Sequence, residues 1–192
     1  MPLDSESRWR LVKLLKSKGA QEEISVDAIE LRLATSEDIK QITEIYNYYV
    51  VNSVVTFDIE KSTEATWQEK LDYLNGLGLP FIVAQSGSGN VLGFAYVAPW
   101  RAKAAYRRTV ENTIYLRPAA IGKRLGTRLL ADLIDRSKAA GVKEIVAVIS
   151  DKGADTSIAL HEAFGFKKQG HLAKVGFKFN RWLGTVLLQK SL

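Results

Sequence analysis

The sequence VENTIYLRPAAIGKRLGT, residues 110–127, decides the fold because it joins a strand to a helix through a short basic loop. Residues 110–117 are expected to form the strand, and residues 123–140 follow a helical period. A strand, loop and helix in this order direct backbone N–H groups and the positive end of the helix toward one point. Lys123 and Arg124 add positive charge there. The segment therefore indicates a pyrophosphate site, although an ordinary strand-to-helix connection fits the same residues.

Hydrophobic periods on both sides of this segment predict an α/β domain. Strands are expected at residues 29–33, 81–85, 91–98, 110–117, 144–150, 166–172 and 185–189. Helices are expected after Thr35 or Ser36, after Thr63, at 123–140 and at 156–164. The turn residues SGSGN at 86–90 join two strands as a hairpin. This order, with a strand-helix-strand crossover after the hairpin, predicts a mixed central β-sheet flanked by helices.

The apolar positions of these elements predict which side chains are buried. The first strand alternates apolar and polar residues, so one face should hold Ile29, Leu31 and Leu33. The aromatic residues at helical spacing are expected in the core: Tyr46, Tyr49 and Trp67. The near-continuous apolar run at 144–150 predicts a strand that is buried on both faces.

Length and composition exclude several classes of protein. The chain has 192 residues, 46% of them apolar and 25% charged, which is typical of one globular domain with or without an extension. It contains no cysteine, so a disulfide framework, a thiol nucleophile and a zinc finger are excluded. The absence of cysteine also fits a reducing compartment, and we expect a cytoplasmic protein. No apolar run approaches the ~18 residues of a membrane span.

Positive charge is concentrated in the middle of the chain. Residues 101–143 carry eleven basic and three acidic side chains, a net charge of +8 against +6 for the whole chain. This excess indicates either an anionic partner or a solvated helix face. Nucleic acid is not the expected partner, because no nucleic-acid motif or pattern of stacking aromatic residues accompanies the charge.

Residues 1–28 are interpreted as an N-terminal extension that precedes a domain at 29–192. Apolar residues from Trp9 to Leu15 alternate with basic ones until Gly19, which predicts a short amphipathic helix. Such a helix more often packs on its own domain or on a partner subunit than on a membrane or nucleic acid. The segment is too charged to be a secretory signal.

Common catalytic motifs are absent from the sequence. It contains no nucleotide phosphate loop, no dinucleotide fingerprint and no nucleophile elbow. The pair His161-Glu162 begins like the helix of a zinc protease, but Gly165 stands where the second histidine would be. The two histidines alone cannot form a metal cage, so no metal is expected.

One ionisable residue is a candidate for proton transfer from its position alone. Glu111 lies in an otherwise apolar strand, where burial raises the pKa of a carboxyl group and suits it to act as a base. The alternative is a glutamate paired with one of the many neighbouring arginines. A single histidine on a short helix, such as His161, is usually structural.

Long motifs in the chain resemble the GCN5-related N-acetyltransferases (GNAT), and within them the phosphinothricin and methionine sulfoximine or sulfone acetyltransferases. The resemblance covers about residues 29–192. It is carried by IYNYYV at 45–50, VTF at 55–57, GFAY at 93–96, APWRAKAAY at 98–106, TVENT at 109–113, VAVI at 146–149, LHEAFGF at 160–166 and GFK at 176–178. The run from Pro99 to Thr113 is the most specific of these.

The resemblance implies that acetyl-CoA binds between the strands 110–117 and 144–150, where they part. Backbone groups near Tyr115 and Leu116 would then hold the pantetheine arm, and an N–H group there would stabilise the oxyanion that forms during transfer. The remaining implied cofactor contacts are Gly122, Lys123, Arg124, Gly126, Thr127 and Ser157.

The resemblance also implies an acceptor and a chemistry. Glu111 would deprotonate the acceptor amine, and His161 would serve as a general acid or in a water network. The acceptor would be a small amino acid-like amine, whose carboxylate favours a cationic site. Its implied contacts are Phe57, Arg101, Lys103 and Tyr106. A homodimer is implied as well, with Phe177, Phe179 and Trp182 as candidate interface residues.

The sequence departs from the family pattern in several places. The family loop Q-x-x-G-x-G becomes Ile121 to Gly126, with Arg124 in place of the first glycine. Ala154 replaces an asparagine, and the family's W-H-D-V reads WLGT at 182–185. Arg107 and Arg108 replace an acidic and an aromatic residue, which predicts a different acceptor. The alternative to an enzyme is a protein that keeps the fold and has lost catalysis.

Overall fold

The computed structural model describes residues 29–192, so the helix expected near Trp9 lies outside the described residues. The strands are β1 (Glu30–Leu33), β2 (Phe81–Gln85), β3 (Val91–Pro99), β4 (Thr109–Leu116), β5 (Glu144–Ser150), β6 (Lys167–Lys178) and β7 (Arg181–Ser191). The helices are α2 (Ile39–Asn52), α3 (Glu64–Gly76), α4 (Leu125–Ala139) and α5 (Asp155–Ala163), with short turns η2 (Ser36–Asp38), η3 (Ala104–Tyr106) and η4 (Pro118–Ala120). The order of strands and helices agrees with the order predicted from the sequence.

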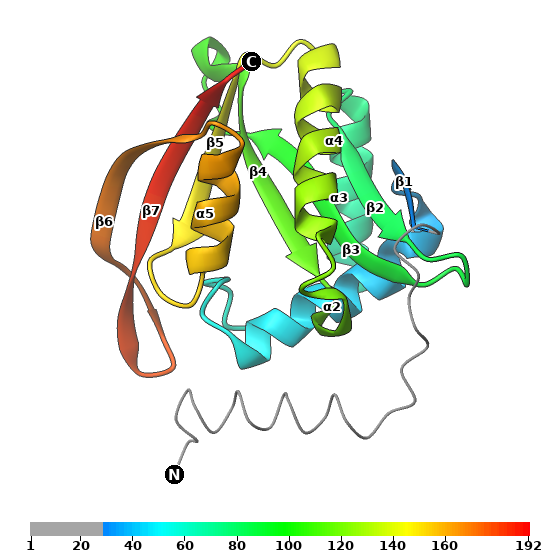
Figure 1. Cartoon of the computed structure of the whole chain (residues 1–192), viewed down its shortest axis with the longest axis horizontal. Coiled ribbons are helices and arrows are strands. Elements are labelled where there is room, and N and C mark those ends of the chain that lie inside the picture. Colours follow the sequence, from blue (N-terminus) through cyan, green and yellow to red (C-terminus); the bar gives the residue numbers. More distant parts are fainter. Residues whose placement is uncertain (1–28) are drawn as a thin grey trace.

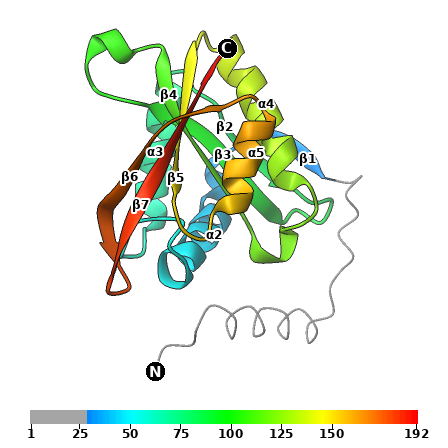
Figure 2. The same cartoon turned by 60° about the vertical axis from the view of Figure 1, so that its left-hand side comes forward.

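The strands form one mixed sheet in the order β1-β2-β3-β4-β5-β7-β6. Neighbouring strands are antiparallel except β4 and β5, which are parallel because α4 crosses between them. The last strand β7 therefore lies inside the sheet, and β6 is outermost on the side away from β1, as Figure 2 shows. The predicted mixed sheet flanked by helices is confirmed.

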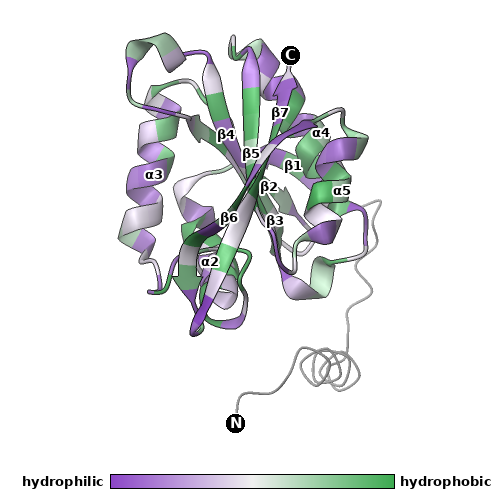
Figure 3. Cartoon of the chain, turned by 90° about the vertical axis from the view of Figure 1, so that its left-hand side faces the viewer, coloured by the Kyte–Doolittle hydropathy of each residue, from purple (hydrophilic) through white to green (hydrophobic). Residues whose placement is uncertain are grey.

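Helices cover both faces of the sheet (Figure 3). Helices α2 and α3 pack on one face around an aromatic core that includes Trp67, Phe81 and Phe94. Helix α4 buries a stripe of leucines on the other face, and α5 lies beside it. Each helix presents one apolar side because its hydrophobic residues recur at helical spacing. None of the helices within 29–192 is long and apolar enough to cross a membrane.

Strands β4 and β5 pair only at their beginning and then part (Figure 1). The pairing joins Thr109–Glu111 to Glu144–Val146, although β4 continues to Leu116 and β5 to Ser150. Beyond Glu111, the side of β4 that faces β5 has no strand partner. Glu111 therefore stands at the apex of a wedge between the two strands.

Some local expectations were wrong, each for a physical reason. Leu33 is 54% exposed although Ile29 and Leu31 pack against the core under α4, since the strand ends at Leu33 and this core does not extend over it. Helix α4 begins at Leu125 rather than at residue 123, because Arg124 has a left-handed backbone with φ 56°. Tyr46 and Tyr49 are half-buried at the margin of the core, and their hydroxyls are hydrogen-bonded. The last two strands are longer than predicted, because β6 contains two register shifts that interrupt its alternation.

The hairpin of β6 and β7 is fastened to the end of β5 by Asp151. Its carboxylate accepts a hydrogen bond from the Gly184 N–H at 2.9 Å and contacts His171 Nε2 at 2.9 Å. Gly184 is required here, because a Cβ atom at this position would lie 2.4 Å from the Asp151 carboxylate and 2.5 Å from the Leu172 carbonyl oxygen. The hairpin ends in a tight turn in which Phe179 and Asn180 both have positive φ, as in a type I′ turn.

We expect the variant Asp151→Asn to unfold at a lower temperature than the wild type at pH 7. The hydrogen bond from His171, and then the Gly184 N–H, holds the pKa of the Asp151 carboxyl below its usual value. A depressed folded-state pKa contributes stability above the unfolded pKa, and that stability is lost as the pH falls through the folded pKa. The difference in Tm should therefore shrink in acid, as scanning calorimetry at several pH values would measure. Asp135→Asn on exposed α4 is the control, and an equal effect of the two changes would contradict the assignment.

Candidate active site

Strand β4 presents alternate side chains to the two faces of the sheet. Ile114 and Leu116 pack into the core under α4, and Asn112 bonds to α5. Tyr115 packs against the aromatic core under α2 and α3. Glu111 therefore points to the α2 and α3 face, beside the wedge where β4 and β5 part.

Glu111 is half-buried and unpaired. Within residues 29–192 its carboxylate has no hydrogen bond and no cation at ion-pair distance, so the arginine-paired alternative is not what the structure shows. Burial raises the pKa of the Glu111 carboxyl, and the nearby cations Lys70 and Arg101 oppose this rise. A carboxyl group with a raised pKa and a free oxygen is suited to accept a proton near neutral pH.

Tyrosine hydroxyls fix the wedge on the α2 side. The Tyr49 hydroxyl donates to the Leu116 carbonyl oxygen at 2.6 Å, which holds the end of β4. The Tyr46 hydroxyl donates to Asp58 at 2.6 Å and lies 2.9 Å from the Thr56 hydroxyl. Burial raises the pKa of Tyr49 to about 12. Helical periodicity predicted only that these tyrosines lie in the core, because it does not reveal where a hydroxyl points.

His161 lies on the opposite face from Glu111 and is 3% exposed. Its Nδ1 donates to the Ser157 carbonyl oxygen at 2.7 Å, and its Nε2 accepts from the Asn112 amide at 2.8 Å. Burial lowers the pKa of the His161 ring, against the opposing effect of the Ser157 hydrogen bond. These partners assign a neutral ring whose only N–H group is already engaged. The structure therefore does not bring Glu111 and His161 to the same face.

The loop before α4 has the backbone shape expected for anion binding. Gly122 and Arg124 have positive φ values of 87° and 56°, and the N-terminus of α4 follows directly. Arg124 thus adopts the left-handed backbone that favours glycine, the residue in the family pattern. Lys123 is half-buried, and Thr127 is exposed in the first turn of α4. Exposed N–H groups and positive charge at a helix N-terminus fit a pyrophosphate.

The rest of the loop region also fits an extended cofactor. The position of a Cβ on Gly126 lies 3.4 Å from the Leu160 side chain, so glycine keeps α4 close to α5. Ser157 is half-buried in the first turn of α5. A Cβ on Gly126 would also lie 3.9 Å from the Leu116 side chain, so the start of α4 lies beside the end of β4.

The residues expected at the acceptor come from two places. Arg101 follows β3, and its guanidinium carbon lies over the Trp100 ring, 5.1 Å from the ring centre. Its positive charge opposes the rise that burial causes in the pKa of Glu111. Lys103 and Tyr106 are exposed around η3, and neither side chain has a hydrogen bond to another described residue. Phe57 lies in the loop after α2 against Gly176 of β6, where a Cβ would be 2.4 Å from its ring.

Three polar residues of the site were missed by the sequence analysis. The charge of Lys70 of α3 lowers the pKa of Glu111, and the Asn112 amide is hydrogen-bonded to His161 Nε2. Lys178 is 4% exposed and donates to the Thr56 carbonyl oxygen at 2.9 Å, which ties the hairpin to the Phe57 loop. Only the motif GFK pointed to Lys178; for Lys70 no sequence signal existed, because it resembles any polar residue of an amphipathic helix.

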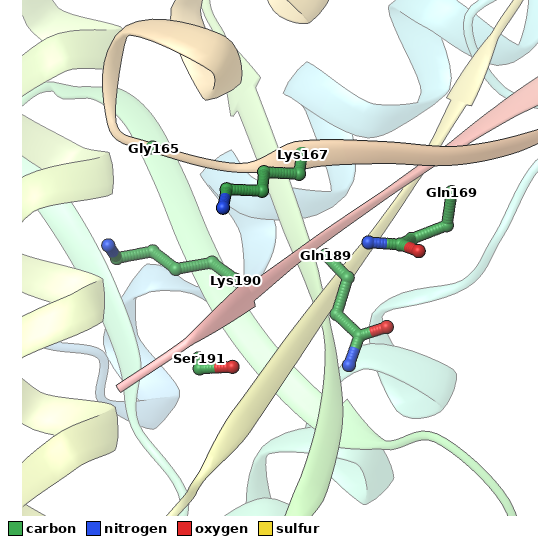
Figure 4. A pocket seen from close by; sticks show the side chains of 6 residues that line it. All are labelled: Gly165, Lys167, Gln169, Gln189, Lys190 and Ser191. Atoms are coloured by element: carbon green, nitrogen blue, oxygen red, sulfur yellow. The ribbon is translucent and has the colours of Figure 1, made fainter.

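A cavity of about 480 Å³ lies away from Glu111, where β6 begins and β7 ends (Figure 4). Its lining contains none of the predicted site residues and consists of Gly165, Lys167, Gln169, Gln189, Lys190 and Ser191. Figure 4 shows the Lys167 and Lys190 side chains extending to the same side of the strands. Across residues 29–192 no cluster of three metal-ligating side chains occurs.

We expect Arg124→Gly to stabilise the fold by about 1 kcal/mol, because a non-glycine residue in the left-handed region costs roughly this much. Urea unfolding of both proteins would measure the difference. Lys123→Gly is the matched control: its backbone is not left-handed, so glycine there should lower the free energy of unfolding. Equal effects of the two changes would contradict the strain assigned to Arg124.

Known proteins share both the sequence and the architecture. A family model described as Acetyltransferase (GNAT) domain matches residues 31–187. The phosphinothricin N-acetyltransferase of Alcaligenes faecalis is 35% identical over 170 residues, 88% of this chain and 86% of that protein. The L-methionine sulfoximine/L-methionine sulfone acetyltransferase of Pseudomonas aeruginosa is 37% identical over 162 residues, 84% of this chain and 94% of that protein. A phosphinothricin acetyltransferase from Sinorhizobium meliloti, solved in complex with acetyl-CoA, superposes with a TM-score of 0.82 at 42% identity and covers 86% of this chain and 89% of its own.

Proposed function

Because this chain belongs to the GNAT acetyltransferase family and is an acetyl-CoA-dependent N-acetyltransferase, we propose that its acceptor is a small amino acid-like amine. The observation that carries the proposal is the wedge of β4 and β5 with the unpaired carboxylate of Glu111 at its apex. The wedge leads to the anion-binding loop at one end, and Glu111 faces the open acceptor side.

The chain's residues divide into a donor side and an acceptor side. Acetyl-CoA supplies an acetyl thioester. On the donor side, the loop at Gly122–Thr127 holds the pyrophosphate, the wedge beside Tyr115 and Leu116 holds the pantetheine arm, and Ser157 contributes from α5. On the acceptor side, Arg101 and Lys103 bind the carboxylate, and Phe57 and Tyr106 flank it. A strand N–H group donates to the carbonyl oxygen on which negative charge develops.

Glu111 acts as the general base. An amine attacks a thioester only when it is unprotonated, and Glu111 accepts its proton directly or through one water molecule. The C–N bond to the acetyl group forms as the C–S bond breaks, and CoA leaves as a thiolate that takes up the second proton that the nitrogen loses. His161 has a positioning role, because its single N–H is bound to Ser157 and its Nε2 holds the Asn112 amide beside the wedge.

Titration calorimetry with acetyl-CoA, with ATP as the charge control, tests the donor side. Saturable micromolar binding of acetyl-CoA and none of ATP is the expected result. Thiol release with a panel of amino acids then identifies the acceptor, with glycine ethyl ester as a control that lacks the carboxylate. Acetyl-CoA binding without thiol release from any amine would favour the alternative of a GNAT-fold binding protein.

We also propose that residues 29–192 form the catalytic domain after the segment 1–28, and that the protein is a homodimer. Support for the dimer comes from large exposed aromatic side chains on the β6–β7 hairpin: Phe177, Phe179 and Trp182 are 55%, 47% and 54% exposed. Aromatic residues are enriched at interfaces. Sedimentation of the full chain should give twice the monomer mass of 21.3 kDa, and the double change Phe177→Ser with Trp182→Ser should return the monomer.

A further inference from the structure

Lys70 of α3 is a half-buried cation held by aromatic rings. Its Nζ lies 4.9 Å from the centre of the Trp67 ring and 5.0 Å from the centre of the Tyr96 ring. It donates a hydrogen bond to the Tyr96 hydroxyl at 3.2 Å. Two ring faces and a hydroxyl fix an ammonium group without neutralising its charge.

Within residues 29–192, no carboxylate lies at ion-pair distance from Lys70. The positive charges of Lys70 and Arg101 both lower the pKa of the Glu111 carboxyl, against the larger raising effect of burial. The sheet register explains this, because Tyr96 pairs with Thr113 and Ala98 with Glu111, so the ring that holds Lys70 stands beside Glu111 on the same face.

The two cations approach Glu111 from different elements. Arg101 belongs to the loop after β3, where Lys103 follows it, while Lys70 comes from α3. An amino acid acceptor brings one carboxylate, for which Arg101 and Lys103 suffice. Lys70 is a further positive charge at the same site, and a second anionic group on the acceptor would complement it.

We propose that Lys70 is a specificity-determining residue that makes this enzyme prefer acceptors whose side chain ends in an anion over neutral acceptors of the same shape. The inference rests on the proposed amino acid-like acceptor. Two compounds that appear in the names of the relatives form a pair of acceptors matched in shape. L-phosphinothricin ends in a methylphosphinate anion, whereas L-methionine sulfone carries a neutral methylsulfone on the same carbon skeleton.

The experiment compares kcat/KM for these two acceptors in the wild type, Lys70→Met and Lys70→Arg. The wild type should prefer L-phosphinothricin by about tenfold or more, since a charge-assisted hydrogen bond is roughly worth that factor. Lys70→Met should lose this preference, so that the ratio of kcat/KM for the two acceptors falls to about one, whereas Lys70→Arg should retain the wild-type ratio. Lys138 is exposed on α4, on the opposite face of the sheet, so Lys138→Met controls for the loss of one positive charge.

A role confined to packing would give a different result. If Lys70 only joins α3 to the sheet, Lys70→Met lowers turnover of both acceptors equally, and that outcome overturns the proposal. Calorimetric binding of the two acceptors in the presence of CoA gives a second, independent readout. Charge-selective binding without turnover of any amino acid would refute the proposed function alone. Equal binding of both acceptors together with equal turnover would refute the role of Lys70 alone.

Discussion

Replacing Glu111 with glutamine is expected to lower kcat by about 10²-fold or more at neutral pH, while the chain stays folded. Glutamine has nearly the same shape but cannot accept the proton of the acceptor amine. Steady-state thiol release at saturating acetyl-CoA and acceptor would measure the change. Glu162→Gln, on the exposed side of α5, is the matched control and should retain activity. A Glu111→Gln enzyme within twofold of the wild type would remove Glu111 from the mechanism.

The pH dependence of the same variant separates a base from a structural carboxyl group. Burial raises the folded-state pKa of Glu111, so the wild-type kcat/KM should fall as the pH drops through that raised value, and Glu111→Gln should lack this acid limb. A raised folded pKa contributes stability below the unfolded pKa, and this contribution is lost as the pH rises through the folded pKa. At pH 7 the variant should therefore be at least as stable as the wild type.

Gly184→Ala is expected to lower the free energy of unfolding by about 3 kcal/mol, near the upper end for overpacking. The added Cβ would lie 2.5 Å from the Leu172 carbonyl oxygen and 2.9 Å from that of Ala173, and these backbone atoms cannot move without displacing β6. Gly170→Ala on the same hairpin is the control, because its Cβ would come no closer than 4.0 Å to the Leu187 side chain. Urea unfolding of both variants would measure the difference. A cost below 1 kcal/mol for Gly184→Ala would show that the hairpin adjusts freely.

The departure at Gly184 has a structural explanation that involves a distant residue. In the family pattern W-H-D-V, which reads WLGT at 182–185 in this chain, the aspartate corresponds to Gly184. In this chain the carboxylate of Asp151, at the end of β5, fills the space that a side chain at 184 would need. His171 Nε2 contacts the same carboxylate, so Gly184, Asp151 and His171 form one hydrogen-bonded unit at the end of β5.

Periodicity was sufficient to predict the order of the elements and the buried strand at 144–150. It did not predict where strands part or where a helix begins, because these depend on backbone geometry, such as the left-handed Arg124. The position of Glu111 in an apolar strand fitted either a base or an arginine-paired carboxylate, and the family resemblance favoured the base. Its lack of an ion pair became clear only in three dimensions. Lys70 could not be found from the sequence, since its role arises from the register of β3 and β4.

The two register shifts in β6 also bear on the solubility of the protein. The free margin of a sheet exposes unpaired backbone groups and can recruit strands from other molecules, which leads to aggregation. In β6 the shifts fall between Lys168 and Gly170 and between Leu172 and Gly176, and Lys167 and Lys174 add charge along the same margin. The uneven spacing and the charge oppose continuous strand addition. The β6–β7 hairpin can therefore keep its exposed aromatic side chains without becoming a starting point for open-ended aggregation.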